Sequence, residues 1–299
     1  MQLPDPTSGA NAPQPGWYPD PWQVAPARWW DGLTWTGFTT PVAAPARLPG
    51  NLYDATARLP AARDDIRGGW IALLGFFGAI ALSLIFAQLG TAFGARTLTV
   101  PSILISQFGL WSGLCMTAYI VSHRRPGGRL TDLGLRVPTG SEIGIGIGIG
   151  FAGIFIATRV AMALRYLFPD NGGSHLFTSS RPSYALVLTI GVLACVGAPL
   201  VEELFFRGVV QPVLMRNLGT SPAIGMQAIL FGLAHFELGM TFNQAAVRCG
   251  TVMVLGVFLG WLRVHTGRLG AGMVAHATYN SIVTIITLIA LLSLASNSN

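Results

Sequence analysis

From residue 69 onward, the chain consists largely of apolar segments as long as a lipid bilayer is thick. These segments cover about residues 69–93, 102–122, 143–164, 185–215, 222–238, 245–263 and 269–293. About 20 consecutive apolar residues allow a helix to cross the hydrocarbon core. The sequence therefore predicts an all-α, polytopic membrane helix bundle of about seven transmembrane helices, with room for an eighth in a re-entrant piece.

Composition and charge support this class. Hydrophobic residues make up 52% of the chain and charged residues only 10%, against about 25% in an ordinary soluble domain. The net charge of +6 comes from arginine, since the chain has no lysine. Ten arginines fall in loops on one side of the predicted bundle and five on the other, which places the N-terminus in the cytoplasm and predicts no nucleic-acid partner.

The stretch "IGIGIGIG" at residues 143–150 alternates in the manner of a β-strand. A lone strand cannot cross lipid, because its backbone groups would have no hydrogen-bond partners. As a helix, the same stretch presents Gly144 with Gly148, and Gly146 with Gly150, at the spacing that allows close helix packing. We therefore predict a helix here.

Residues 1–40 differ from the rest of the chain. Residues 16–38 hold five of the eight tryptophans, and Asp31-Gly32 between aromatic flanks indicates a hairpin turn. We predict a small β-hairpin-like, Trp-rich module with its core at 14–40, followed by a flexible Ala/Pro linker at 41–66. "GWYPDP", "RWWDG" and "WT" resemble a bacterial module known only as a domain of unknown function. The resemblance implies a bacterial cell (plasma) membrane protein whose tryptophans form a mini-core or contact a protein partner.

Several ionisable and amide side chains lie within the predicted spans, where each ionised group costs about 2.5–3.5 kcal/mol. They are Glu202, Glu203, Arg207, His235, His276 and Asn280. Glu203 and Arg207 are four residues apart and can neutralise each other on one helical face. Glu202 points about 100° away around the helix and needs another partner.

The depths of these residues in the membrane suggest that partner. Glu202 lies roughly 21 Å along the helix axis from Arg216, and His235 lies roughly 18 Å back along the next helix. His276 and Asn280 are roughly 12 and 18 Å from Arg268. A single histidine in a span is more often a helix-packing residue than a catalyst. Here, however, three helices bring Glu202, His235, His276 and Asn280 to one layer.

A carboxylate, two imidazoles and a carboxamide at one depth can carry out hydrolysis of an amide by activated water. A buried carboxylate suits a general base. A histidine can share a water with it, or both can hold a metal, and the second histidine and the asparagine can donate hydrogen bonds to an oxyanion.

Three motifs then match a known pattern. "EELFFRG" matches EExxxR, "FGLAH" (Phe231 to His235) matches FxxxH, and "HATYN" (His276 to Asn280) matches HxxxN. In this order they resemble the CAAX-protease and bacteriocin-processing family of intramembrane proteases. The resemblance implies a protease domain at 67–299, with its motif core at 198–282, that acts on a membrane-associated, prenylated or secreted peptide in the lipid bilayer.

By this resemblance, Glu202 and His235 activate water, and His276 and Asn280 line the oxyanion hole. Glu203, Arg207 and Phe231 support the site. No cofactor is certain. The sequence leaves open a divalent metal such as Zn²⁺, held by Glu202, His235 and His276. The alternatives are a non-catalytic membrane scaffold or bacteriocin-immunity protein, and a proton-coupled transporter.

Overall fold

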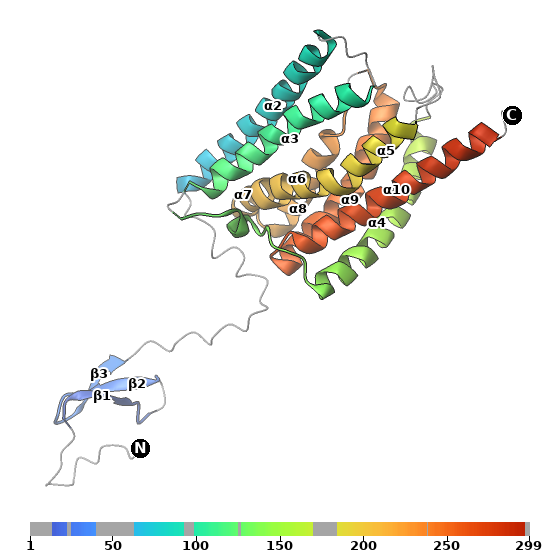
Figure 1. The fold of residues 1–299 in the computed structure, drawn as a ribbon. Coiled ribbons are helices and arrows are strands. Elements are labelled where there is room, and N and C mark those ends of the chain that lie inside the picture. The colour runs from blue at the N-terminus through green and yellow to red at the C-terminus, as the bar shows by residue number, and fades with distance from the viewer. Residues whose placement is uncertain are drawn as a thin grey trace. The chain divides into compact units, whose positions relative to one another are not determined.

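The structure, a computed structural model, describes residues 14–22, 25–39, 63–92, 99–124, 127–169, 184–237 and 239–296. It divides into two compact units, residues 1–51 and residues 52–299. The second unit is a bundle of apolar helices, which confirms the predicted fold class (Figure 1). Within the described residues, six helices are long and apolar enough to cross a membrane.

The bundle is built from paired helices. α2 (Arg63–Ala92) packs along α3 (Val100–Ser122), and α4 (Gly140–Leu167) packs along α10 (Gly270–Ser296) (Figure 1). A short 3₁₀ helix, η1 (Leu130–Leu133), lies between α3 and α4 in the chain. A long helix over 184–218 contacts both pairs. The α4–α10 pair and this long helix together carry most of the predicted site residues.

The helix over 184–218 is continuous, but its turns are not uniform. It consists of α5 (Tyr184–Val192), η3 (Leu193–Gly197), α6 (Ala198–Glu202), η4 (Glu203–Val210) and α7 (Gln211–Leu218). The segments η3 and η4 are π-helical, and each ends two residues before a proline. π-Helical turns are rare and occur often at functional sites. Glu202 and Glu203 lie at the junction between α6 and η4.

The fifth predicted span is shorter than expected. Where the sequence predicts a span over 222–238, the structure has α8 (Thr220–Leu233), a helix of 14 residues. At about 1.5 Å per residue, this helix is roughly 21 Å long and falls short of the hydrocarbon thickness. The chain turns at Ala234 and His235 before α9 (Phe242–Thr266) begins.

The glycine-rich stretch 143–150 is helical, as predicted, and forms part of α4. One of its two glycine pairs faces α10. A Cβ atom at Gly146 would come within 2.7 Å of Val274, and one at Gly150 would come equally close to Thr278. The other pair, at residues 144 and 148, has nothing within 4 Å. Close packing of α4 on α10 therefore uses only the first pair.

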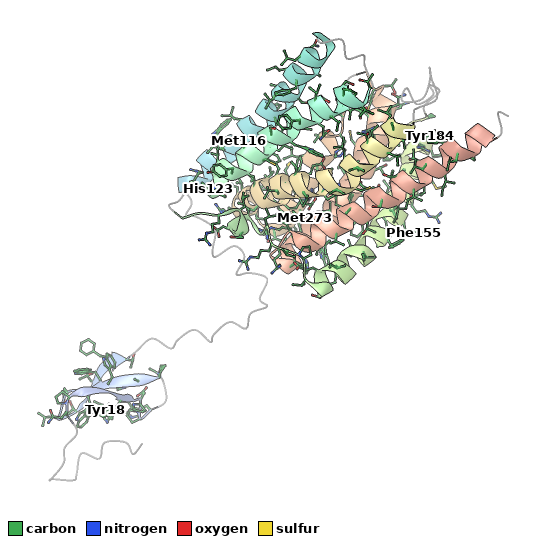
Figure 2. All side chains as sticks on the ribbon, in the orientation of Figure 1. Tyr18, Met116, His123, Phe155, Tyr184 and Met273 are labelled. Carbon is green, nitrogen blue, oxygen red and sulfur yellow. The ribbon has the colours of Figure 1, made fainter. Side chains whose placement is uncertain are left out.

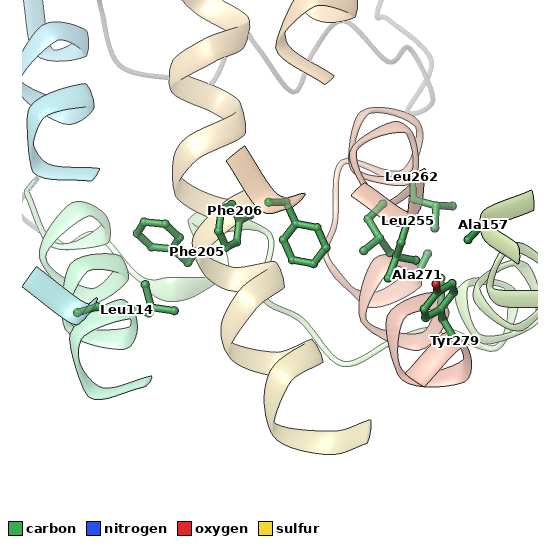
Figure 3. Packing of buried hydrophobic residues seen from close by; sticks show 12 residues of the cluster. Leu114, Ala157, Phe205, Phe206, Leu255, Leu262, Ala271 and Tyr279 are labelled. Carbon is green, nitrogen blue, oxygen red and sulfur yellow. The ribbon is translucent and has the colours of Figure 1, made fainter. Parts of the chain in front are cut away.

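The core lies around the central helix. Figure 3 shows Phe205 and Phe206 projecting from η4, with Leu114 of α3 on one side and residues of α9 and α10 on the other. The outward faces of the bundle carry exposed apolar side chains such as Met116 and Phe155 (Figure 2). A bundle that is apolar on its outside is typical of a lipid environment. The chain is an integral membrane protein.

The N-terminal unit is a three-stranded antiparallel sheet in the order β1 (Gly16–Pro19), β2 (Ala27–Trp30), β3 (Trp35–Thr39). Its β2–β3 turn lies at the predicted Asp31-Gly32, and Gly32 has a φ of +98°, which favours glycine. Trp30 is buried against the edge of Trp35, with ring centroids 5.2 Å apart. Tryptophans therefore form the small core of this sheet.

Candidate active site

Glu202 and His276 meet inside the bundle, although 73 residues separate His276 from the neighbouring Glu203. The Glu202 Oε2 atom lies 3.9 Å from the His276 Nε2 atom, and the two side chains are 14% and 3% exposed. The Glu202 Oε2 atom is buried and has no hydrogen-bond partner within the described part of the chain. A carboxylate oxygen in this state is available to accept a hydrogen bond from a water or a substrate.

Glu203 connects the arginine of the first motif with the histidine of the third. Its Oε1 atom lies 3.0 Å from Nη1 of Arg207 and 3.2 Å from Nδ1 of His276. All three side chains are buried. The predicted ion pair between Glu203 and Arg207 is present, and the same carboxylate also orients the His276 ring. With Nδ1 turned toward Glu203, Nε2 is directed toward Glu202.

His235 lies just beyond the end of α8, rather than inside a spanning helix as the sequence suggested. Its own backbone N–H bonds to the carbonyl of Gly232, so the carbonyl of Phe231 does not receive that hydrogen bond. The ring Nδ1 atom of His235 lies 2.8 Å from this Phe231 carbonyl and can donate to it. That hydrogen bond leaves Nε2 as the acceptor nitrogen of a neutral ring.

The Phe231 ring packs between the two histidines. Its centroid is 4.9 Å from the His235 ring and 5.7 Å from the His276 ring, in both cases edge to face. The Arg207 guanidinium lies 4.2 Å from the same centroid. A fully buried phenylalanine at this position fixes the orientation of both imidazoles.

Asn280 has a hydrogen bond that the sequence alone does not suggest. Its Nδ2 atom donates to the carbonyl of Ala194 at 2.6 Å. In the π-helical segment η3, the N–H of Ala198 bonds five residues back to Leu193, and the next residue, Pro199, has no N–H. The Ala194 carbonyl therefore lacks a backbone donor, and Asn280 supplies one. The second Nδ2 hydrogen of Asn280 remains for another acceptor.

Arg263 plays the same part for the second π-helical segment, a role that the sequence analysis missed. The N–H of Gln211 bonds to Phe206, and Pro212 again lacks an N–H, so the carbonyl of Arg207 has no backbone donor. The Nε atom of Arg263 donates to it at 3.2 Å. The sequence signal for this contact is Pro212, five residues after Arg207, because a proline has no N–H to donate to that carbonyl.

The candidate residues line one cavity of about 1340 Å³. Glu202, Phe231, His235, His276 and Asn280 all contribute to its wall. Glu203 and Arg207 lie behind this wall. Five predicted residues from three parts of the chain therefore face one space large enough for a peptide segment.

The candidate residues are not arranged as a set of metal ligands. Within the described residues, no group of three His, Cys, Asp or Glu side chains is placed so that it could hold a metal ion. The three residues considered for Zn²⁺, Glu202, His235 and His276, are thus not arranged as a ligand set. The Nδ1 atom of His276 contacts Glu203, and the Nδ1 atom of His235 contacts the Phe231 carbonyl.

Two regions of the chain are similar to known protein families. Residues 184–282 match the family model "Type II CAAX prenyl endopeptidase Rce1-like", and residues 15–48 match a family of unknown function, DUF2510. The human protein "CAAX prenyl protease 2" is 32% identical over 95 residues, which are 28% of this chain and 29% of that protein. No solved structure shows significant similarity.

The chain spans less than a third of the length of this human relative. Residues 184–282, which match the family model, nevertheless contain all three motifs and every residue predicted for the site. The similarity is thus to Rce1-like CAAX prenyl endopeptidases over residues 184–282 and to DUF2510 over residues 15–48.

Proposed function

We propose that the chain is an intramembrane endopeptidase that hydrolyses a peptide bond of a membrane-associated substrate. The observation that carries this proposal is the convergence of Glu202, His235, His276 and Asn280 on one cavity inside an apolar bundle. The match to prenyl endopeptidases at residues 184–282 supports it independently. A prenylated or secreted peptide is the substrate class that follows.

In the proposed reaction, Glu202 removes a proton from a water molecule, and the resulting hydroxide attacks the scissile carbonyl carbon. His235 accepts the second water proton in a hydrogen bond through Nε2 and so orients the nucleophile. The carbonyl oxygen gains negative charge, which the free Nδ2 hydrogen of Asn280 stabilises. His276 adds a second donor through Nε2–H as an imidazolium, because its Nδ1–H is directed to Glu203. The proton on Glu202 then passes to the leaving nitrogen as the C–N bond breaks, giving a carboxylic acid and an amine.

Glu203 and Arg207 position the site without touching the substrate. The Glu203 carboxylate holds the His276 ring through Nδ1, and Arg207 neutralises that carboxylate. The protein's own carboxylate and imidazoles supply every step above. The proposed protease domain covers 67–299, preceded by the Trp-rich module at 1–40 and the linker at 41–66.

The direct test is proteolysis by the purified full chain in nanodiscs, with an S-farnesylated peptide as the probe. Glu202→Gln is expected to lower kcat by about a hundredfold to ten-thousandfold, the typical contribution of general-base catalysis. Glu237→Gln changes the other carboxylate that lines the cavity and should retain cleavage. Cleavage by Glu202→Gln at the wild-type rate would overturn the proposal and favour a scaffold or a transporter.

The distribution of arginines supports a cytoplasmic N-terminus in a bacterial plasma membrane. With that orientation, α2 and α3 cross and return, so α4 begins at the cytoplasmic face and ends at the outer face. The C-terminal end of α4 contributes Arg165 to the cavity wall. The cavity therefore extends toward the outer face.

A further inference from the structure

One wall of the cavity is formed by a single stripe of side chains on α3. The α3 residues that line the cavity are Ile103, Gln107 and Trp111, which follow one another at intervals of four residues. Side chains at this spacing share one face of a helix. The stripe is apolar at Ile103 but carries an amide and an indole N–H at the other two positions. None of the three residues belongs to the sequence motifs of the candidate site.

Trp111 packs on the central helix but makes no hydrogen bond there. The tip of its six-membered ring lies against Gly197, the last residue of η3, where an added Cβ atom would overlap the ring. This contact fixes the indole, yet the Nε1 atom is buried and has no hydrogen-bond partner within the described residues. Buried indole N–H groups usually have an acceptor. A molecule bound in the cavity would supply one.

Gln107 lies one turn nearer to the N-terminus of α3 and is half-buried. No hydrogen bond joins its amide to any residue that the structure describes. A carboxamide carries both an acceptor oxygen and two donor hydrogens. Gln107 can therefore pair with both an N–H and a C=O group of a peptide backbone, whereas the Trp111 indole can serve only an acceptor.

The spacing of these two side chains matches an extended polypeptide. Four residues of an α-helix advance by about 6 Å along its axis. Alternate residues of an extended chain face the same side and repeat every 6.4–6.8 Å, or about the same distance. A helical ligand would not suit the stripe, because its carbonyls already bond to its own N–H groups. An extended chain inside a membrane protein, in contrast, needs partners for its backbone groups.

The stripe also lies at a suitable distance from the proposed catalytic carboxylate. Glu202 follows Gly197 by five residues, so Trp111 contacts the central helix about 7–8 Å from the level of Glu202. That distance is the length of about two extended residues. α3 and the helix over 184–218 run in the same direction (Figure 1). Gln107 therefore lies about 6 Å farther from Glu202 than Trp111 does.

We propose that Gln107 and Trp111 bind the backbone of the substrate in an extended conformation, beginning about two residues from the scissile bond. This inference rests on the proposed endopeptidase function. It assigns a substrate-binding role to two residues of α3 that lie outside the motifs. Because every polypeptide has the same backbone groups, this contact holds the substrate without reading its side chains. It favours a segment that is unwound next to the cleavage site.

An ester scan of the substrate tests this inference. Quenched fluorescent peptides with an S-farnesyl cysteine carry one amide-to-ester replacement each, at successive backbone positions on both sides of the scissile bond. An ester has no N–H and a weaker carbonyl acceptor, so it weakens backbone contacts with Gln107 and Trp111. Wild-type protein should show a KM raised about twofold to tenfold at two positions, with a smaller change in kcat. These positions should lie two residues apart on one side of the scissile bond.

Two variants assign the sensitive positions to their partners. Trp111→Phe removes the indole N–H and keeps an aromatic ring, and Gln107→Met removes the amide and keeps the side-chain length. Each variant should bring the ester-to-amide ratio of KM close to one at a single position and leave the other ratio unchanged. Trp70→Phe is the matched control, since Trp70 is an exposed tryptophan of α2 that does not line the cavity. It should keep both ratios.

The same peptides, titrated by fluorescence anisotropy against Glu202→Gln, measure binding without turnover. That measurement separates failure of this inference from failure of the proposed reaction. Two results would overturn the inference. One is equal affinity of the Glu202→Gln protein for the amide peptide and every ester peptide. The other is a pattern of ester sensitivity that Trp111→Phe and Gln107→Met leave intact.

Discussion

Glu202 and Glu203 are adjacent in the sequence but have different surroundings. Glu203 is fully buried and contacts both Arg207 and His276, whereas Glu202 lines the cavity. Each of the two keeps one oxygen without a hydrogen-bond partner among the described residues. One carboxylate therefore lies in a buried ion-pair cluster, and the other is accessible from the cavity, as the proposed reaction requires. Sequence reasoning predicted the pair of Glu203 with Arg207, which is present. It could not identify His276 as the side chain that lies near both glutamates.

Stability measurements should distinguish the two glutamates. Glu203→Gln leaves the Arg207 guanidinium buried without its counter-charge, and breaking a buried pair in this way costs about 3–5 kcal/mol. Glu202→Gln removes no ion pair to an arginine and should change stability by less than about 1 kcal/mol. Thermal unfolding in the same detergent measures both. Equal destabilisation by the two variants would contradict the assignment.

At the scale of elements, the central helix is shaped by its two prolines and by side chains from other helices. Pro199 and Pro212 have no backbone N–H. The carbonyls of Ala194 and Arg207 are therefore left without a backbone hydrogen-bond donor. Asn280 of α10 and Arg263 of α9 satisfy them. The π-helical turns on both sides of Glu202 therefore depend on contacts from distant parts of the chain.

A double-mutant cycle tests this dependence. Asn280→Ala should destabilise the protein by about 0.5–1.5 kcal/mol, because the Ala194 carbonyl then loses its side-chain donor. Pro199→Ala restores an N–H at residue 199, so the double variant should lose much less stability than the sum of the single changes. Chemical unfolding in detergent gives the coupling energy. Strict additivity would show that the proline does not create the need for Asn280.

The glycines of α4 provide a second test at this scale, with controls in the same helix. Gly146→Ala and Gly150→Ala place a methyl group 2.7 Å from α10 side chains, which should cost about 1–3 kcal/mol. Gly144→Ala and Gly148→Ala point into open space and should be neutral or slightly stabilising. Unfolding of the four variants under one condition decides the matter. Loss of stability at residue 148 would mean that α4 packs through its other face.

At the scale of the whole molecule, the N-terminal unit and the membrane unit are stabilised by different interactions. The membrane unit depends on close helix packing, whereas the small sheet depends on tryptophan contacts and on Asp20. The Asp20 carboxylate accepts hydrogen bonds from Arg28 and from the backbone N–H groups of Ala25 and Trp22. The hydrogen bond from Arg28 has the largest effect, and together they lower the pKa of Asp20 from 3.8 to about 2.

This lowered pKa predicts that acid destabilises the sheet. A carboxyl whose pKa is lower in the folded state contributes stability above its unfolded pKa of about 4 and loses it as the pH falls through the folded value. The N-terminal unit of the full chain should therefore unfold between about pH 4 and pH 2. Asp31, whose pKa is lowered by backbone N–H groups of Thr34 and Leu33, acts in the same direction.

Tryptophan fluorescence of the full chain measures this transition, since five of the eight tryptophans lie in residues 16–38. Asp20→Asn should make the sheet less stable at neutral pH and flatten the response between pH 4 and pH 2. A wild-type transition that Asp20→Asn leaves unchanged in size and midpoint would rule out Asp20 as its origin.

The sequence by itself determined the apolar helix bundle, the helical state of residues 143–150, the Trp-rich hairpin and the residues that carry the three motifs. The first two follow because lipid requires every backbone group to be paired within a segment. The hairpin follows from its turn residues and aromatic flanks. Only the tertiary structure decided that His235 lies beyond a short helix, that His276 contacts both glutamates, and that Asn280 and Arg263 complete the π-helical turns. These features depend on which buried hydrogen-bond donors and acceptors remain unpaired once the helices pack together. Helices that are distant in the chain decide this, so local sequence does not reveal it.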